Sequence, residues 1–548
     1  MQQGKIWFKP YFRIGAVATC CFLLCLGLTP DFFSNINFLL NSENPARNTS
    51  VFVVLLFAGF GSLAGVLYID YRVLRYLWFL ILGMSAAASQ VKYHITGNVF
   101  DLVSARLIWN EASEITSIFT QYWFELLVSS VVAVVFVGML CLGHYFLKLR
   151  SRKPQPVWRQ IFLGVLPMAV IGTYLMVGLV KGGEALQFNP EPYRALAQVI
   201  YIKHNSLSLD SASFLDVTAK RVKQPASDKI ILIVDESIRS DYGFNDWRKI
   251  ENFIPNDLHG KMYAFSRSYA QHTCSQFSNV AIRWGLDFRK AIAEKKSTIW
   301  QYAKAADMQT TYIDSQRRFG QLQNMMNEQE ASFVDNFIQF NEVPQVERNE
   351  QFFEKDLMAA QNVNAELLSE NKSFVMVNKL GAHFPYEGKY PLSEALYKPH
   401  MDLWEVSSKA SLETRRNSYK NAVQFNLSSF FGRIFSGLQE TEYTIIYTSD
   451  HGQNLENINQ GAHCTGIKSP KTQALVPLVV FSTNKVVMDK LNQLGASGSQ
   501  ETSNRHIFPT LLWLMGYDDD VIMPYGKTLF DPATEGDFDY RADDVFVN

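Results

Sequence analysis

Four polar segments of this 548-residue chain carry residue types that bind divalent metal ions. They are Asp235 with Glu236, then His383, then Asp450 with His451, and finally His463. Carboxylates and neutral imidazoles form the oxygen and nitrogen ligand set that suits Zn²⁺ or a similar ion. Each segment alone is also typical of a turn, a loop histidine or a helix cap. Their combination is what favours a metal site.

A hydroxyl-rich stretch, residues 266–279, could supply a nucleophile to such a site. A hydroxyl bound to a divalent metal loses its proton readily and becomes a nucleophile near neutral pH. Thr273 and Ser275 are the two candidates. The alternative interpretation is that the stretch begins a helix, with Thr273 or Ser275 as its cap.

Residues 228–548 alternate apolar runs with helical patterns, which favours an α/β domain with a largely parallel central sheet and helices on both faces. Ligands of such sheets bind beyond the carboxyl ends of the strands, where three of the polar segments lie. The predicted strands are 230–234, 310–313, 374–377, 444–448 and 475–482, and the predicted helices are 299–306, 356–369, 414–438 and 506–516.

Residues 1–180 are dominated instead by apolar runs that approach the roughly 20 residues needed to cross a bilayer. We predict a transmembrane domain of about five helices at 1–180, a connector at 181–227 and a soluble domain at 228–548. The predicted spans are 11–29, 51–69, 73–90, 124–147 and 159–180.

Lys and Arg gather in the predicted loops of one side, namely before span one, between spans two and three, and between spans four and five. Basic loops stay in the cytoplasm, so the N-terminus is predicted to be cytoplasmic and the soluble domain external. In a bacterium, the outside is the periplasm or the cell surface. The external loop 91–123 is either a solvated amphipathic helix or a surface that meets a lipid head group.

The overall composition excludes several classes of protein. The chain is 47% apolar, and its 51 basic and 52 acidic residues nearly cancel. A disordered chain would be less apolar and carry more net charge, and a nucleic-acid binder would show a basic excess. Six cysteines are too few for a disulfide scaffold. Two of them, Cys274 and Cys464, fall in the soluble domain.

Taken together, these motifs resemble the alkaline phosphatase superfamily and, more narrowly, the membrane-anchored phosphoethanolamine transferases that act on lipid A or the lipopolysaccharide core. The run 231–239 resembles the apolar strand and Glu-Thr/Ser-x-Arg of that family. Residues 380–385 resemble its Gly-Ser-His-Gly-Pro segment, and residues 449–452 its Asp-His-Gly. The spacing from Phe265 to Thr273 matches the family's spacing to its nucleophilic threonine.

The resemblance implies that a primary Zn²⁺ is bound by Glu236, Thr273, Asp450 and His451. Thr273 would be the nucleophile, and an alignment on the sulfatase pattern would give that role to Ser275 instead. His383 and His463 would flank the phosphoryl group or hold a second metal ion. The substrate-binding candidates are Asn110, Glu111, Glu114, Arg317, Arg318 and Lys468.

The chain also departs from the family pattern. Gln271 and His272 stand where the family has Cys-Gly, and the segment 313–318 is closer to the core-glycan relatives than to the lipid A enzymes. Cys274 and Cys464 adjoin predicted site residues, so they either pair or lie near the metal.

The implied function is that of a zinc-dependent enzyme of the bacterial inner membrane. It would move phosphoethanolamine from phosphatidylethanolamine to an envelope glycan, such as lipid A or a core sugar, through a phospho-threonine intermediate. A phosphoglycerol transferase or phosphodiesterase on the same scaffold is the alternative. A membrane scaffold with a dead site is a further reading, although such a protein would not keep competent residue types at all six site positions.

Overall fold

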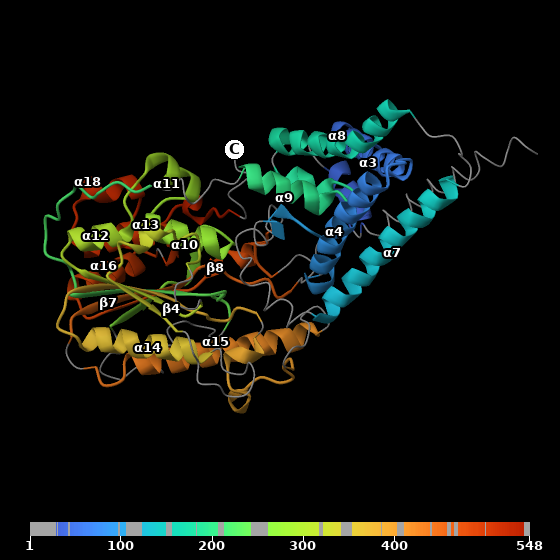
Figure 1. The fold of residues 1–548 in the computed structure, drawn as a ribbon. Coiled ribbons are helices and arrows are strands. Elements are labelled where there is room, and N and C mark those ends of the chain that lie inside the picture. Colours follow the sequence, from blue (N-terminus) through green and yellow to red (C-terminus); the bar gives the residue numbers. More distant parts are fainter. Residues whose placement is uncertain are drawn as a thin grey trace, which may run out of the picture. The chain divides into compact units, whose positions relative to one another are not determined.

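The structure is a computed structural model, drawn in Figure 1. It describes residues 29, 31–41, 44–96, 99–102, 104–105, 123–148, 156–181, 183–205, 213–242, 261–316, 322–340, 353–384, 386–402, 410–438, 441–456, 462–464, 469–498 and 500–541. The chain divides into two compact units, which meet in sequence between Ser206 and Leu207.

The first unit contains helices that are long and apolar enough to cross a membrane. They are α3 (Pro45–Leu67), α4 (Arg72–Thr96), α7 (Trp123–Lys148) and α8 (Val157–Lys181). The described residues therefore hold four such helices and not the five that we predicted, which corrects the count. The first predicted span, 11–29, lies outside the described residues except for Thr29. These helices make the chain a membrane protein.

Shorter helices complete the first unit. Helix α2 (Phe32–Leu40) has nine residues; at about 14 Å it is too short for a hydrocarbon core of about 30 Å. Segments η2 (Gly183–Phe188) and α9 (Arg194–Asn205) lie in the predicted connector and belong to this unit. Of the loop 91–123, the central part with Asn110, Glu111 and Glu114 lies outside the described residues.

Polar side chains in the helices of the first unit bond to backbone carbonyls of neighbouring helices. Trp78 Nε1 donates to the Gly164 carbonyl at 3.0 Å, and the Tyr174 hydroxyl donates to the Leu55 carbonyl at 2.9 Å. Because a hydrocarbon environment offers no water, such contacts satisfy groups that would otherwise be costly to bury.

The second unit is built on a seven-stranded sheet with the order β2-β9-β7-β1-β6-β4-β5. Strands β1, β4, β5, β6 and β7 run parallel and β9 runs antiparallel, so the predicted largely parallel sheet is confirmed. The strands are β1 (Lys229–Asp235), β2 (Met262–Ala264), β4 (Gln309–Asp314), β5 (Asn336–Gln339), β6 (Ser373–Asn378), β7 (Tyr443–Ser449) and β9 (Leu478–Ser482).

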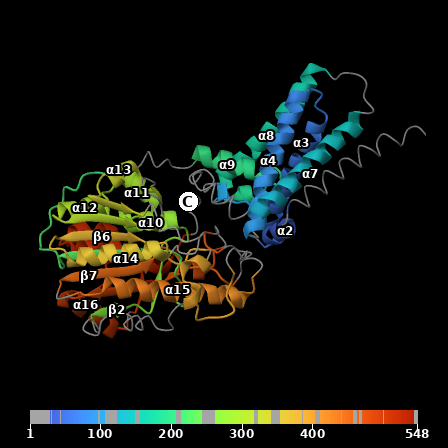
Figure 2. The same ribbon diagram turned by 60° about the horizontal axis from the view of Figure 1, so that its bottom comes forward.

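Both faces of this sheet are covered. In the central strand β1, Leu232 packs into one core cluster and Ile231 and Ile233 pack into the other. Period-two alternation with apolar residues on both sides is typical of a parallel sheet between helices. Helices α14 (Phe353–Leu368) and α15 (Leu412–Ile434) lie across one face (Figure 2). The other face is covered by α10 (Ser275–Trp284), α12 (Ile299–Ala305) and α17 (Ile507–Leu514).

The predicted strand 475–482 is two strands, which is a correction. Pro477 separates β8 (Leu475–Val476) from β9, since proline has no N–H to donate to a ladder. Strand β8 belongs to a second, three-stranded sheet with β3 (Arg267–Tyr269) and β10 (Glu501–Ser503). The remaining described helices of this unit are α11 (Phe288–Glu294), α13 (Glu328–Ala331), η6 (Glu387–Lys389), η7 (Leu392–Glu394), η10 (Lys471–Gln473), α16 (Lys485–Ala496), η11 (Asn504–His506), α18 (Asp519–Ile522), η12 (Met523–Tyr525) and η13 (Glu535–Phe538).

Candidate metal centre

The carboxyl ends of the central strands bring the predicted ligands together. Asp235, the last residue of β1, pairs in register with Ser449, the last residue of β7. Glu236 and Asp450 therefore leave the sheet side by side. Strand β6 ends at the same edge, because Val234 pairs with Asn378. The sheet topology thus places residues from distant parts of the sequence at one site.

Glu236, Asp450 and His451 form a buried group whose ligand atoms all lie within 4.8 Å of one another. His451 Nε2 lies 3.3 Å from Glu236 Oε1 and 3.7 Å from Asp450 Oδ2. Two carboxylates and one imidazole in this arrangement could hold a divalent cation.

Hydrogen bonds orient each of the three side chains. Asp450 Oδ1 accepts the backbone N–H groups of Ser237 at 3.2 Å and His451 at 2.7 Å. Among the described residues, none donates a hydrogen bond to the buried Oδ2 of Asp450, which lies 3.7 Å from His451 Nε2. His451 Nδ1 bonds to the Gly452 carbonyl at 2.7 Å, which leaves Nε2 as the ring nitrogen toward the carboxylates. Metal-binding histidines typically donate their second nitrogen in this way. The residues therefore fit a metal ion.

The electrostatics of the group agree with a cation at its centre. Burial, together with the charge of Glu236, raises the pKa of the Asp450 carboxyl to about 8. Burial lowers the pKa of His451, but Asp450 and Glu236 outweigh it and raise this pKa to about 9. Burial also opposes the charge of Glu236, yet the hydrogen bond and charge of His451 hold its pKa well below the ordinary value. Negative charge on the two buried carboxylates is therefore costly on its own, and a divalent ion would neutralise it.

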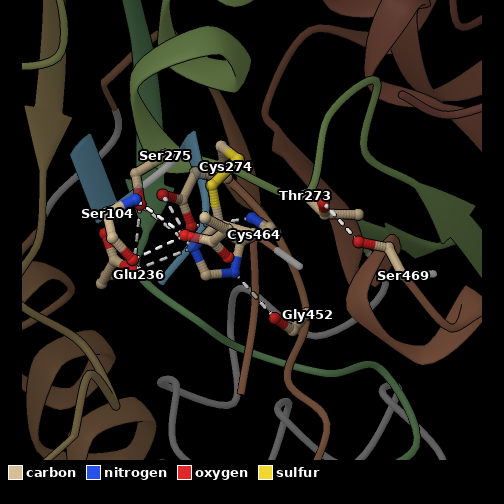
Figure 3. The surroundings of a disulfide bond; sticks show 11 residues. Ser104, Glu236, Thr273, Cys274, Ser275, Gly452, Cys464 and Ser469 are labelled. Atoms are coloured by element: carbon tan, nitrogen blue, oxygen red, sulfur yellow. Dashed lines mark hydrogen bonds and ion pairs between the residues drawn. A yellow bond between two sulfur atoms is a disulfide. The ribbon is translucent and has the colours of Figure 1, made fainter. Parts of the chain in front are cut away.

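The structure brings Ser275, and not Thr273, to this group (Figure 3). Ser275 Oγ lies 3.0 Å from His451 Nε2 and 3.4 Å from Glu236 Oε1. The Thr273 hydroxyl lies 3.3 Å from Ser469 Oγ and points away from Glu236. Cys274 is the N-cap of α10, so the stretch does begin a helix, although neither Thr273 nor Ser275 is the cap.

Two further histidines, the predicted His383 and His463, lie beside the group. The ring of His463 stacks on His451, with centroids 4.3 Å apart and planes at 24°. The exposed His383 meets His463 edge-on, at 5.7 Å. His463 is half-buried, so its imidazole lies between the buried ligand and the exposed histidine.

Several supporting residues were not among the predicted site residues. Gln316 Nε2 donates to Glu236 Oε2 at 3.2 Å and to the Lys379 carbonyl at 2.7 Å, so it orients a ligand. Lys379 forms a fully buried ion pair of 2.6 Å with Asp235, whose other oxygen accepts the Glu236 N–H at 2.9 Å. Burial lowers the pKa of Lys389 to about 8. Two signals in the sequence pointed to these residues. Gln316 stands beside the predicted Arg317, and Asp235 was among the candidate metal ligands, although it pairs with Lys379 instead.

Gly381 allows the segment before His383 to pass against the end of β1. Its φ is +52°, which side chains rarely tolerate, and an added Cβ would come within 2.5 Å of the Glu236 carbonyl oxygen and 2.7 Å of the Glu236 nitrogen. The predicted substrate-binding residues Arg317, Arg318 and Lys468 lie outside the described residues.

Comparison with known proteins identifies the family. The sulfatase family model matches residues 229–517, which is more than half of the chain. The Kdo(2)-lipid A phosphoethanolamine 7''-transferase of Escherichia coli (strain K12) is 27% identical over 158 residues, and that of Salmonella typhimurium (strain LT2) is 28% identical over 158 residues. The match covers 27% of this chain and 27% of each relative, so it spans about a quarter of their length.

A solved structure shares the fold over most of the chain. The lipooligosaccharide phosphoethanolamine transferase A of Neisseria meningitidis, an integral membrane protein, superposes with a TM-score of 0.62 at 16% identity. The match covers 93% of this chain and 98% of that one. The predicted resemblance to the alkaline phosphatase and sulfatase superfamily is confirmed, and the chain belongs to the sulfatase family.

Proposed function

We propose that this protein transfers phosphoethanolamine from phosphatidylethanolamine to a lipopolysaccharide-type glycan, such as lipid A or a core sugar, through a covalent phosphoester on Ser275. The observation that carries the proposal is the position of the Ser275 hydroxyl, 3.0 Å from His451 Nε2 within the metal-ligand group. The acceptor class is supported by the relatives, which are named for phosphoethanolamine transfer to Kdo(2)-lipid A.

Glu236, Asp450 and His451 would hold the metal, and we propose zinc because the donor set is one imidazole and two carboxylates. When bound there, zinc would lower the pKa of a nearby hydroxyl and stabilise negative charge on phosphoryl oxygens. The number of ions is left open, since His383 and His463 could serve either a second ion or the phosphoryl group.

Side chains of the protein have separate roles in the two steps of the proposed transfer. Ser275 Oγ forms a bond to phosphorus, and the bond from phosphorus to the diacylglycerol oxygen breaks. Ser275 is the first residue of α10, so the helix N-terminus favours negative charge at its oxygen and on the phosphoryl group. His463 or His383 would take the proton of the Ser275 hydroxyl and deliver it to the leaving diacylglycerol oxygen. In the second step the same group would accept the proton of the attacking glycan hydroxyl and return it to Ser275 Oγ as the bond from Oγ to phosphorus breaks.

The membrane unit fits a lipid donor. We propose that the junctions of α3 with α4 and of α7 with α8 face the cytoplasm of a bacterial inner membrane. Arg72 and Arg75 lie at the start of α4, and the second junction holds five basic residues, Lys148, Arg150, Arg152, Lys153 and Arg159. Helix α8 then ends on the periplasmic side, and the catalytic unit follows it. Asn110, Glu111 and Glu114, with the cations Arg317, Arg318 and Lys468, remain the predicted contacts to the substrates.

Peptide mapping of the full-length protein tests the proposal. The zinc-loaded chain is incubated with phosphatidylethanolamine and reduced, and the tryptic peptide 268–283, which contains both Thr273 and Ser275, is analysed by mass spectrometry. We expect a phosphoethanolamine adduct on Ser275 that Ser275→Ala abolishes and Thr273→Ala preserves. The Thr273→Ala variant is the matched control, because it removes a hydroxyl two residues away.

Other outcomes would change the proposal in defined ways. An adduct on Thr273 would restore the threonine assignment and contradict the geometry. A phosphoglycerol adduct in a parallel incubation with phosphatidylglycerol, with no adduct from phosphatidylethanolamine, would establish the alternative donor. If no adduct formed and no diacylglycerol were released, the transferase proposal would fail.

A further inference from the structure

A disulfide joins two segments of the metal centre that lie 190 residues apart in the sequence. Cys274 directly precedes Ser275, and Cys464 directly follows His463. Figure 3 shows the two sulfur atoms beside the group that contains Glu236 and Ser275. The bond therefore connects the backbone of the proposed nucleophile to the backbone of a proposed acid.

We propose that the Cys274–Cys464 disulfide is a positioning device, which holds the imidazole of His463 against the metal-ligand group so that transfer depends on the oxidised state of the two cysteines. The effect on transfer rests on the proposed function. The effect of the disulfide on the position of the His463 imidazole does not depend on that function, and it can be measured separately.

The backbone around Cys464 is tied closely to the start of α10. The Cys464 N–H donates to the Thr273 carbonyl at 2.9 Å, next to the disulfide itself. Cys464 also has a φ of +55°, a left-handed conformation that side-chain-bearing residues seldom adopt. Such a conformation persists where the surroundings determine it strongly. A covalent bond at the same residue is a constraint of that kind.

The position of His463 depends on Cys464, the residue that the disulfide holds. On its other side, the Ala462 carbonyl accepts the Asn454 N–H at 2.7 Å, and the ring stacks on His451 at 4.3 Å. Without the disulfide, these hydrogen bonds and the ring contact would still act, but each is a non-covalent contact that contributes modestly on its own, and residues 462–464 are only half-buried. The disulfide adds a covalent contact that water cannot replace.

The placement matters because a proton donor must lie within hydrogen-bond reach of the leaving oxygen. A displacement of about 1 Å in such a group lowers a rate roughly 100-fold. We therefore expect loss of the disulfide to lower kcat by about 10- to 100-fold. The KM for the lipid should change little, because the substrate contacts predicted for the cations do not involve the cysteines.

The first test measures the place of His463 without any turnover. The full-length protein is labelled with diethyl pyrocarbonate in four forms: oxidised, reduced with a phosphine that does not chelate zinc, reoxidised, and Cys274→Ala/Cys464→Ala. Peptide mass spectrometry gives the labelling rate of each histidine. We expect reduction to raise the rate at His463 at least fivefold and reoxidation to restore it. His400, which contacts Tyr390 and the Met401 carbonyl, is the internal control.

The second test asks whether the disulfide acts through His463. His463→Ala is made in the wild-type background and in the Cys274→Ala/Cys464→Ala background, and diacylglycerol release and bound zinc are measured for all four proteins. We expect His463→Ala to slow the wild type 10- to 100-fold and to have almost no further effect when the disulfide is absent. A merely structural disulfide would give two independent losses that multiply. Bound zinc should stay equal across the set.

The proposal would be overturned by an unchanged labelling rate at His463 on reduction, or by independent effects in the second test. If the alanine double variant fails to fold, the reversible reduction of the wild-type chain decides the matter instead. Absence of diacylglycerol release from the oxidised wild type would refute the proposed function, while the labelling rates would still decide the placement of His463.

Discussion

Replacing Gly381 by alanine should damage the metal centre far more than its size suggests. Gly381 has a φ of +52°, and an added Cβ would meet Asp235 Oδ1 as well as the backbone of Glu236, the latter at 2.5 Å and 2.7 Å. Backbone atoms of a buried strand end cannot swing aside as a flexible side chain would. The substitution therefore has to move the ligand Glu236 or the segment that leads to His383.

The size of the effect follows from two separate contributions. The left-handed backbone costs about 1 kcal/mol for any residue with a Cβ. The steric clash adds about 1–3 kcal/mol, as in overpacked cores. Gly437 provides a matched control, because its φ is +69° and nothing lies within 4 Å of an added Cβ. Gly437→Ala should thus show the backbone contribution alone.

The assay is thermal unfolding of the full-length protein together with its zinc content. At roughly 2–3 °C per kcal/mol for a domain of this size, Gly437→Ala should lower Tm by about 2–3 °C. Gly381→Ala should lower it by roughly 4–12 °C and weaken zinc binding at least tenfold. Equal Tm shifts and equal zinc contents in the two variants would refute the steric argument and the link between Gly381 and Glu236.

Three further predictions concern charge and metal. Lys389→Met should stabilise the chain at pH 7 by on the order of 3 kcal/mol, because burial lowers the Lys389 pKa from 10.5 to about 8. Between pH 8 and pH 10.5 the unfolded wild-type chain binds more protons than the folded one, so its stability rises with pH. The difference in Tm between the variant and the wild type should therefore close as pH rises from 8 to 10.5. Lys379→Met should lower the free energy of unfolding, measured in urea, by about 3–5 kcal/mol, because it leaves Asp235 of a fully buried ion pair without its partner. Adding Asp235→Asn should restore most of that free energy. Chelation should lower Tm by roughly 8 °C, and zinc should restore it, if zinc is present at about 1,000 times its Kd; an unchanged Tm would argue against a metal here.

The sheet and the ends of its strands could be predicted from the sequence because burial leaves a strong pattern there. Strands β1 and β7 are apolar on both faces, and the residues that follow them are carboxylates and a histidine. Once the strands are taken as parallel, Glu236 and Asp450 must meet at one edge. The register of β1 against β7 confirms that reasoning.

The choice between Thr273 and Ser275 could not be made in the same way. The two residues lie on either side of the start of α10, where Cys274 has an extended backbone, and the Thr273 hydroxyl lies next to Ser469. Local sequence does not say at which residue the helix begins, because no side chain caps it. The break at Pro477 was missed for a related reason. The run 475–482 is apolar throughout, and its division depends on which of two sheets each part joins.

The separation of the two paired cysteines also bears on how the chain matures during folding. Strands β4 to β7 all lie between Cys274 and Cys464, so the second thiol reaches the first only after these strands have been synthesised. The chain's other four cysteines, at positions 20, 21, 25 and 141, lie in or near the apolar N-terminal runs. The second unit therefore offers no rival thiol of its own. An oxidant suffices to complete this bond, and the chain would not need an isomerase to correct it.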